Sequence, residues 1–442
     1  MSTPRNAVAR TARLAALPLG YAGRSALGLG KRLGGAPAET VLGELQQRTA
    51  EQLFRTLGEL KGGAMKVGQA MSIFEAALPD EIAAPYRDQL TRLQDSAPPM
   101  PTITVREILT RELGDDYAEH LTDLDPLPAA AASIGQVHRA RWDGQDVAVK
   151  VQYPWAGDAL RNDLRQLARV ARGLGPAFPG IDVKPLVAEL QARVEEELDY
   201  HLEAEAQRVF AEEYAGDPDI AVPRVVAGSA EVLVSEWMDS PASLAQVIRD
   251  GTQQERDHYG EVFVRFLFGG PARTGMLHAD PHPGNFRLLP EPDGTPGRLG
   301  VLDYGAVARL PEGQLPETLG TLIRIACLDD YDQLVDALRA EGFIKEGVRV
   351  DADRLRSYLS PFTEPARTDS FTFSRSWMQQ QFKRLNDPRG DAYPVMLRLN
   401  LPPAYLLIHR TWVGGVGVLS QLGATIPFRQ ILEESLPGFA GS

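Results

Sequence analysis

Apolar side chains recur at helical spacing in the first hundred residues. From Glu39 to Leu60 they fall three and four positions apart, while glutamate and glutamine fill the other face. A second helix is expected after the glycine pair at 62–63, and it carries Lys66 and Gln69 on one side because these residues are three positions apart. The pattern stops at a proline-containing linker, residues 96–101. This part of the chain is therefore predicted to be a helical extension.

The hydrophobic period changes to two after one more helical pattern at residues 103–113. Two alternating runs, residues 137–142 and 147–151, flank Asp143-Gly144, and this arrangement favours a β-hairpin. A further strand is expected at residues 232–236. The middle of the chain is thus predicted to contain a small sheet.

Helical patterns cover residues 159–172 and 185–214, and they dominate from Ser243 onward. They are interrupted by a loop at 278–285 and a short segment at 299–305. A small sheet-bearing lobe followed by a helical lobe is an α+β arrangement. Four parts are predicted: a basic arm at 1–36, the helical extension at 37–100, an N-lobe with inserted helices at 101–240 and a helical C-lobe at 241–442.

Composition places the chain among soluble globular proteins, because 43% of its 442 residues are hydrophobic and 24% are charged. Its single cysteine, Cys327, excludes an intramolecular disulfide and suits a reducing, cytoplasmic location. We expect it to be buried filler. No run of about 18 apolar residues is present, and the best candidate, residues 411–419, is short. We therefore expect no membrane-spanning helix.

Charge is distributed unevenly along the chain. The net charge of −13 argues against general nucleic-acid binding, which needs a basic face. Residues 1–35 nevertheless carry six basic residues and no acid. Three interpretations remain open for this arm: attraction to an anionic membrane surface, a transit peptide, or a solvated tail. The first would make the protein peripheral at the inner face of a membrane.

Residues suited to phosphoryl transfer follow one another in a fixed order. Lys150 ends a predicted strand, and Glu203 lies 53 positions later in a predicted helix. Asp280 and Asn285 are five apart, which is the spacing of a kinase catalytic loop, and Asp303 begins an Asp-aromatic-Gly turn. Together they predict a site for ATP and Mg²⁺, with Asn285 and Asp303 as metal ligands and Asp280, Lys150 and Glu203 as catalytic residues.

Each of these signals has a plainer interpretation when it is taken alone. A strand lysine is commonly an edge charge, and Asp-Tyr-Gly is a common turn. His278 and His282 could bind a metal, but two prolines in the loop prevent a helical ligand pair, so structural roles are favoured for both. The order and the internal spacing make the combined interpretation strong.

Acidic residues are concentrated in the segment 189–213. Glu195, Asp199 and Glu203 recur there at i, i+4, and their carboxylates repel one another unless cations pair with them. One interpretation is a solvated acidic face. In the other, Lys150 pairs with Glu203 while Lys66 pairs with Glu197 and Asp199.

A run of alanines stands where a kinase has its glycine-rich phosphate loop. Residues 129–132 are all alanine, and Gly135 is the one glycine nearby. Ala132 replaces a glycine where close approach to phosphate would be expected. Taken alone, an alanine run could start a helix.

The sequence resembles the UbiB/AarF/ADCK family of atypical kinases, in its coenzyme Q-type subgroup, over about residues 37–435. Lys66 to Gln69 match the family's K-x-G-Q signature, Ala130 to Ser133 its alanine-rich loop, and Glu197 to Asp199 its E-x-D motif. The resemblance implies a protein-kinase-like two-lobed fold with a family-specific N-terminal helical extension. It also implies nucleotide contacts from Ala130, Ala131, Ala132, Ser133, Lys150 and Glu236, and gating by Lys66, Gln69, Glu197 and Asp199.

The resemblance further implies an ATPase or small-molecule kinase that supports isoprenoid quinone biosynthesis or lipid homeostasis and does not phosphorylate proteins. The expected partners are ATP, a lipid or quinone precursor, an anionic membrane surface and quinone-biosynthesis enzymes. Two alternatives stay open: an antibiotic-type small-molecule phosphotransferase, and a nucleotide-binding scaffold with negligible turnover.

Overall fold

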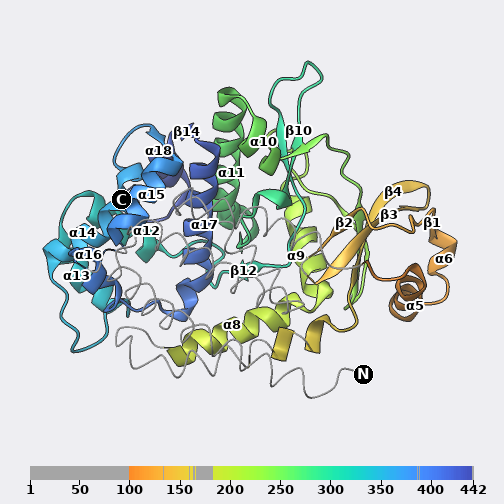
Figure 1. The fold of residues 1–442 in the computed structure, drawn as a ribbon, viewed down its shortest axis with the longest axis horizontal. Coiled ribbons are helices and arrows are strands. Elements are labelled where there is room, and N and C mark those ends of the chain that lie inside the picture. The colour runs from red at the N-terminus through yellow and green to blue at the C-terminus, as the bar shows by residue number, and fades with distance from the viewer. Residues whose placement is uncertain are drawn as a thin grey trace, which may run out of the picture.

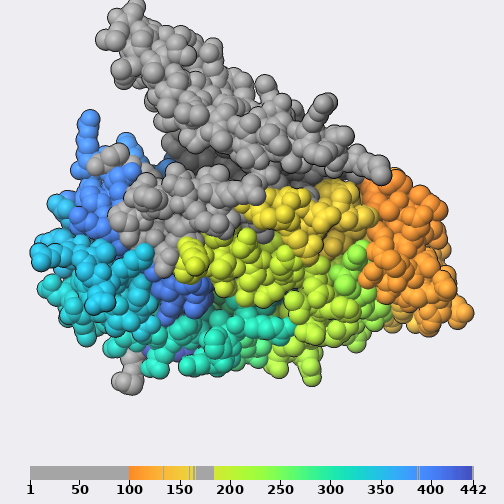
Figure 2. All heavy atoms as spheres, turned by 90° about the horizontal axis from the view of Figure 1, so that it is seen from below, coloured from red at the N-terminus to blue at the C-terminus, as the bar shows by residue number. Residues whose placement is uncertain are grey.

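The computed structural model describes residues 99–132, 134–158, 160–162, 165, 183–385, 387 and 389–440. Figure 1 shows two lobes, one built on a sheet and the other on helices. In Figure 2 the orange residues that follow 99 and the cyan and blue helices beyond 320 lie at opposite ends, with the yellow-green residues between them. This is the two-lobed α+β fold that the sequence predicts. The arm, the helical extension with Lys66 and Gln69, and Ser133 lie outside the described residues.

The small lobe is built on a six-stranded antiparallel sheet with the order β1-β3-β4-β7-β6, in which β2 also pairs with β3. The strands are β1 (Leu121–Thr122), β2 (Ala130–Ala131), β3 (Gly135–Trp142), β4 (Gln145–Gln152), β6 (Val225–Gly228) and β7 (Val232–Glu236). Between β3 and β4, Asp143 and Gly144 have φ values of 48° and 82°. Positive φ at both central residues defines a type I′ turn, so the predicted hairpin is confirmed.

Helices with bounds within the described residues that accompany this sheet are α5 (Thr102–Leu113), α6 (Tyr117–His120), α8 (Val183–Glu197) and α9 (Tyr200–Glu213). The single helical pattern over residues 185–214 is therefore two helices. Asp199 causes the break, because it adopts an extended conformation (φ −114°, ψ 100°) and its carboxylate accepts the backbone N–H of His201 at 3.0 Å. This cap starts α9 as a helix separate from α8, and α9 contacts β6 and β7.

The large lobe consists mainly of helices, as the sequence predicts. They are α10 (Leu244–Asp250), α11 (Gln253–Thr274), α12 (Glu317–Cys327), α13 (Tyr331–Ala340), α14 (Ala352–Thr363), α15 (Arg375–Leu385), α16 (Ala392–Met396), α17 (Leu406–Leu422), α18 (Phe428–Ser435) and the 3₁₀ turns η3 (Pro283–Asn285), η4 (Glu364–Ala366) and η5 (Pro403–Tyr405). Within the described ranges, no helix has the length and apolar character needed to cross a bilayer.

Short strands beside these helices position the loops of the site. One sheet has the order β5-β11-β10-β8, and two-stranded pairs form between β9 and β12 and between β13 and β14. Their bounds are β5 (Ile220–Ala221), β8 (Ala242–Ser243), β9 (Met276–His278), β10 (Phe286–Leu289), β11 (Arg298–Val301), β12 (Val307–Arg309), β13 (Phe371–Thr372) and β14 (Thr425–Ile426). The sequence analysis anticipated only the β11 region, because strands of two to four residues are too short to show an alternating period.

The core of the large lobe surrounds α11, in which Phe263 and Leu267 have no exposed surface. Phe268 packs against Trp412 of α17 and Phe428 of α18, with ring centroids 5.2 and 6.2 Å apart. These aromatic contacts fix α17 beside the segment that carries the site.

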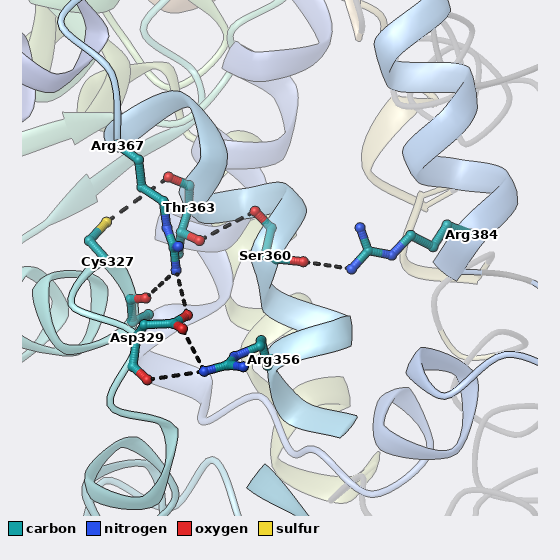
Figure 3. A network of polar contacts seen from close by, with 8 residues as sticks. Cys327, Asp329, Arg356, Ser360, Thr363, Arg367 and Arg384 are labelled. Carbon is teal, nitrogen blue, oxygen red and sulfur yellow. Dashed lines mark hydrogen bonds and ion pairs between the residues drawn. The ribbon is translucent and has the colours of Figure 1, made fainter. Parts of the chain in front are cut away.

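Cys327 at the end of α12 is half-buried and lies 4.0 Å from the carbonyl of Thr363, so the expectation of a buried filler is only partly met. Beside it, Asp329 accepts hydrogen bonds from Arg356 and Arg367, and Arg367 also donates to the carbonyl of Ala326 at 2.6 Å (Figure 3). This network joins the end of α12 to α14 and the turn that follows it.

Asp217 links the end of α9 to α11, and we expect Asp217→Asn to lower the free energy of unfolding by about 1–3 kcal/mol at pH 7. Its carboxylate accepts from Arg273 at 2.6 Å and from the backbone N–H groups of Asp219 and Ile220 at 2.9 Å. Burial alone would raise the pKa of Asp217, but the Arg273 hydrogen bond and the two backbone donors outweigh it and lower the pKa below 3.8.

Because the folded-state pKa lies below the unfolded one, this contribution is present above pH 3.8 and is lost as the pH falls through the lowered value. Urea unfolding of wild type and Asp217→Asn from pH 7 towards pH 3 tests this. A stability difference that stays constant with pH would contradict the assignment.

Candidate functional site

Lys150 lies in β4, in register with Val137 of β3 and Leu233 of β7. Its neighbours Val149 and Val151 are fully buried in the small-lobe core, so the pleat turns Lys150 to the opposite face. There its Nζ donates to Glu203 Oε1 at 2.7 Å and Oε2 at 2.9 Å.

Glu203 of α9 is 3% exposed, and Lys150 Nζ also lies 3.7 Å from Asp303 Oδ1. Burial alone would lower the pKa of Lys150, but the Asp303 and Glu203 carboxylates outweigh it and raise that pKa well above its ordinary value. Burial raises the pKa of Glu203, and the Lys150 ammonium counters that effect in part. The lysine thus remains charged between two carboxylates.

The loop between β9 and β10 presents Asp280, and the 3₁₀ turn η3 at its end presents Asn285. Asn285 Nδ2 donates to Asp280 Oδ2 at 3.1 Å and to the Asp280 carbonyl at 3.3 Å. Arg410 Nη2 of α17 donates to Asp280 Oδ1 at 3.0 Å, and the Asp280 side chain is only 7% exposed. The bonds hold the Asp280 carboxylate in one orientation.

Arg410 was not among the residues that the sequence analysis selected. It lies 130 positions from Asp280, so no local spacing connects the two. The one available signal was a cation in an otherwise apolar stretch, residues 406–422.

Asp303 follows β11, and hydrogen bonds hold both its carbonyl and its carboxylate. His278 Nε2 donates to the Asp303 carbonyl at 2.6 Å, and Gly305 N donates to Asp303 Oδ1 at 2.9 Å. Tyr304 is buried, with its ring 5.0 Å from Phe210 and 5.5 Å from His278. The Asp303 side chain nevertheless stays 27% exposed and lies on the side of Lys150.

His278 therefore supports the Asp303 backbone, and His282 Nδ1 accepts the N–H of Gly284 at 3.1 Å. Both contacts agree with the structural roles that the sequence analysis favours for these histidines. Among the described residues, no cluster of three or more His, Cys, Asp or Glu side chains is placed to hold a metal.

Asp303 and Asn285 are the residues that could serve Mg²⁺. Mg²⁺ takes oxygen ligands and commonly uses one or two protein groups, with phosphate oxygens and waters completing its octahedron. Asn285 directs its amide nitrogen to Asp280, which leaves its amide oxygen for another contact. The donor set fits a magnesium ion that arrives with a nucleotide.

The alanine run forms a strand and a turn, so the alternative of a helix start is wrong. Ala130 and Ala131 make β2, which pairs with β3, and Ala132 N donates to Gly135 O at 2.9 Å to close the turn. Gly135 is needed here, because an added Cβ would lie 2.2 Å from the carbonyl oxygen of Val151.

The remaining predicted residues lie in different surroundings. Glu236 ends β7, where its carboxylate accepts from the side chain and backbone of Arg224 at 2.7 and 3.0 Å and its own N–H donates to the Arg224 carbonyl at 2.9 Å. Its contact with a nucleotide stays a prediction. Asp199 caps α9, and Glu197 ends α8. Their predicted partner Lys66, and the other gating residue Gln69, lie outside the described residues, so the gating hypothesis stays a prediction.

Comparison with known proteins finds kinase-like relatives over most of the chain. The family described as "ABC1 atypical kinase-like domain" matches residues 92–338. The atypical kinase coq-8, mitochondrial, of Caenorhabditis elegans is 29% identical over 96% of this chain and 56% of its own length. ACTIVITY OF BC1 COMPLEX KINASE 1, chloroplastic, of Arabidopsis thaliana is 32% identical over 68% of this chain and 44% of its own. The chain thus spans about half the length of these curated relatives.

A solved structure is also similar: the complex of Rv3197 with erythromycin from Mycobacterium tuberculosis. It is 42% identical, with a TM-score of 0.67, over 92% of this chain and all of that one. The family match covers more than half of the chain, and the resemblance found in the motifs is confirmed. The chain belongs to the ABC1 atypical kinase-like family, which includes the UbiB/AarF and ADCK kinases.

Proposed function

We propose that the protein binds Mg²⁺-ATP and cleaves its terminal phosphoanhydride bond, as an ATPase or a small-molecule kinase. The observation that carries this proposal is the Lys150 ammonium held at 2.7 Å from Glu203 and 3.7 Å from Asp303. A charged lysine fixed by a helix carboxylate, beside a metal-binding aspartate, is the arrangement that phosphoryl transfer uses.

Each residue would have a distinct part in this reaction. Lys150 would hold the nucleotide phosphates, and Glu203 would keep its ammonium in place. Asp303 and Asn285 would hold Mg²⁺, which when bound neutralises the phosphate charge. Asp280, oriented by Asn285 and Arg410, would accept a proton from the attacking water or hydroxyl.

Hydrolysis of ATP by the purified protein, with and without Mg²⁺, tests the proposal. We expect Asp280→Asn to lower turnover by about 100-fold or more while nucleotide binding is kept. A wild-type protein that binds ATP but turns it over negligibly would favour the nucleotide-binding scaffold instead. Turnover stimulated by phenolic quinone precursors, but not by aminoglycosides, would separate a quinone-pathway enzyme from an antibiotic phosphotransferase.

The relative named coq-8 supports a role in isoprenoid quinone biosynthesis or lipid homeostasis, with a lipid or quinone precursor and pathway enzymes as partners. A peripheral position at an anionic membrane would bring the site to such substrates. A metabolite profile of a deletion strain tests the pathway. Flotation with liposomes, comparing the full chain with one lacking residues 1–35, tests the contribution of the basic arm.

Binding of a macrolide is a second candidate function. It is supported by the 42% identity to the Rv3197 chain, whose structure is described as a complex with erythromycin. Equilibrium dialysis of erythromycin against the purified protein tests it, and a dissociation constant above the millimolar range would exclude it.

A further inference from the structure

The ammonium of Lys150 has an aromatic neighbour as well as its two carboxylates. Its Nζ lies over the ring of Tyr200, 5.0 Å from the centroid. An ammonium within about 6 Å of a ring face is attracted by the ring's quadrupole. A lysine is a point charge on a flexible stem, so a third contact restricts the directions in which its remaining N–H can point.

Tyr200 is itself firmly held. It is the first residue of α9, 1% exposed, and its backbone N–H donates to the carbonyl of Ala230 at 3.0 Å. Glu203 follows three residues later, so the two side chains lie on the same face of α9. One helix turn therefore provides both the carboxylate and the ring that contact Lys150.

The hydroxyl end of Tyr200 reaches the turn of the alanine-rich hairpin. A Cβ added to Gly135 would lie 3.0 Å from the Tyr200 hydroxyl oxygen, so the phenol packs against this glycine. That hydroxyl is buried and has no hydrogen-bond partner in the described part of the chain, which is uncommon for a buried polar atom. The side chain thus spans from Lys150 to the start of β3.

We propose that Tyr200 is a positioning residue for Lys150. Its ring holds the ammonium in the orientation that meets the nucleotide phosphates, and its contact with Gly135 makes α9, β4 and the alanine hairpin move together. The inference rests on the proposed function, because its consequence is the alignment of Lys150 with a bound nucleotide.

Replacing the ring should affect substrate binding more than turnover. We expect Tyr200→Leu to raise the KM for Mg²⁺-ATP about threefold to tenfold and to leave kcat within about twofold. If Lys150 contacts the phosphates equally in the ground state and the transition state, misplacing it weakens both complexes by the same amount. Such a loss raises KM and leaves kcat unchanged. A merely structural role would instead reduce the folded fraction, lowering kcat at unchanged KM.

Two further replacements separate the ring from the hydroxyl. Tyr200→Phe keeps the ring and should have a KM within about twofold of wild type, with no loss of thermal stability, because the hydroxyl has no partner to lose. Replacing Tyr200 by 3,4,5-trifluorophenylalanine keeps the shape but weakens the quadrupole, and should raise KM as the leucine does. This replacement keeps the test decisive if Tyr200→Leu fails to fold.

Tyr331 supplies a matched control. It is also the first residue of a helix, is 3% exposed and lies under a cation, Arg356, at 5.4 Å. Tyr331→Leu should lower stability as Tyr200→Leu does, with KM unchanged. Equal KM shifts in both variants, or a wild-type KM in the trifluorophenylalanine protein, would overturn the inference.

A measurement without nucleotide separates this inference from the proposed function. In crystals of nucleotide-free Tyr200→Leu, Lys150 Nζ should move from its wild-type position and change its distances to Glu203 and Asp303. If wild type fails to bind Mg²⁺-ATP, the proposed function fails while this structure still tests the positioning role. A Lys150 Nζ that stays 2.7 Å from Glu203 and 3.7 Å from Asp303 would refute the role whatever the nucleotide does.

Discussion

Asp303→Asn should abolish the Mg²⁺ dependence of nucleotide binding and weaken the affinity for Mg²⁺-ATP by about 100-fold or more. The amide keeps an oxygen for the N–H of Gly305, now at 2.9 Å, so the turn should stay folded. The substitution removes the negative charge that would face the metal. It also removes charge repulsion with the phosphates, so the affinity for ATP without Mg²⁺ should stay the same or increase.

Isothermal titration with ATP, with and without Mg²⁺, measures both effects on one sample. Asp351→Asn is the matched control, because Asp351 caps α14 and asparagine is an equally good cap. That variant should bind as wild type does. Unchanged Mg²⁺-ATP affinity in a folded Asp303→Asn protein would exclude Asp303 as a metal ligand.

Features with a local cause, or marked by a fixed order of motifs, could be predicted from the sequence. The β3–β4 hairpin follows from Asp143-Gly144, since both residues adopt the positive φ that a type I′ turn needs. The Lys150–Glu203 contact was predicted from the order of motifs, and the helices of the large lobe from their period. In each case the information lies within a few residues or in a recurring pattern.

Features caused by distant segments could not be predicted in this way. Strand β5 exists because its residues pair with β11, about 80 positions later, and its two residues show no period of their own. Alanine has a high helix propensity, so the local sequence of the alanine run favours a helix. Pairing with β3 makes Ala130 and Ala131 a strand instead. Arg410 reaches Asp280 only because packed aromatic side chains place α17 beside the loop.

The α8–α9 break lies between these cases. Asp199 is a good N-cap, but it also fits the i, i+4 acidic series with Glu195 and Glu203, and that series was interpreted as one continuous helix. The structure shows that Asp199 acts as a cap, because its carboxylate accepts the backbone N–H of His201 at 3.0 Å. A short polar side chain within an acidic run is thus a better indicator of a helix start than of a helix face.

Removing one member of the buried Lys150–Glu203 pair should lower the free energy of unfolding strongly. Replacing both members together should change it little. Lys150→Met leaves a carboxylate that is 3% exposed without its cation, and we expect it to lower the free energy of unfolding by about 3–5 kcal/mol at pH 8. Burial already raises the pKa of Glu203, and losing the lysine raises it further, so the folded state binds a proton that the unfolded state releases. The deficit should therefore be smallest at pH 5 and grow as the pH rises.

The double variant Lys150→Met, Glu203→Leu removes both charges and fills the space with apolar groups. It should recover most of the lost stability, because replacing a buried ion pair by apolar residues of similar volume is often neutral. Its ATP turnover should nevertheless stay at the level of Lys150→Met, because no cation remains for the phosphates. Urea unfolding of both single variants and the double variant at pH 5 and pH 8 gives the coupling energy. If the losses in unfolding free energy were additive and independent of pH, the two side chains would be solvated separately. The raised pKa of Lys150 could then not be attributed to Glu203.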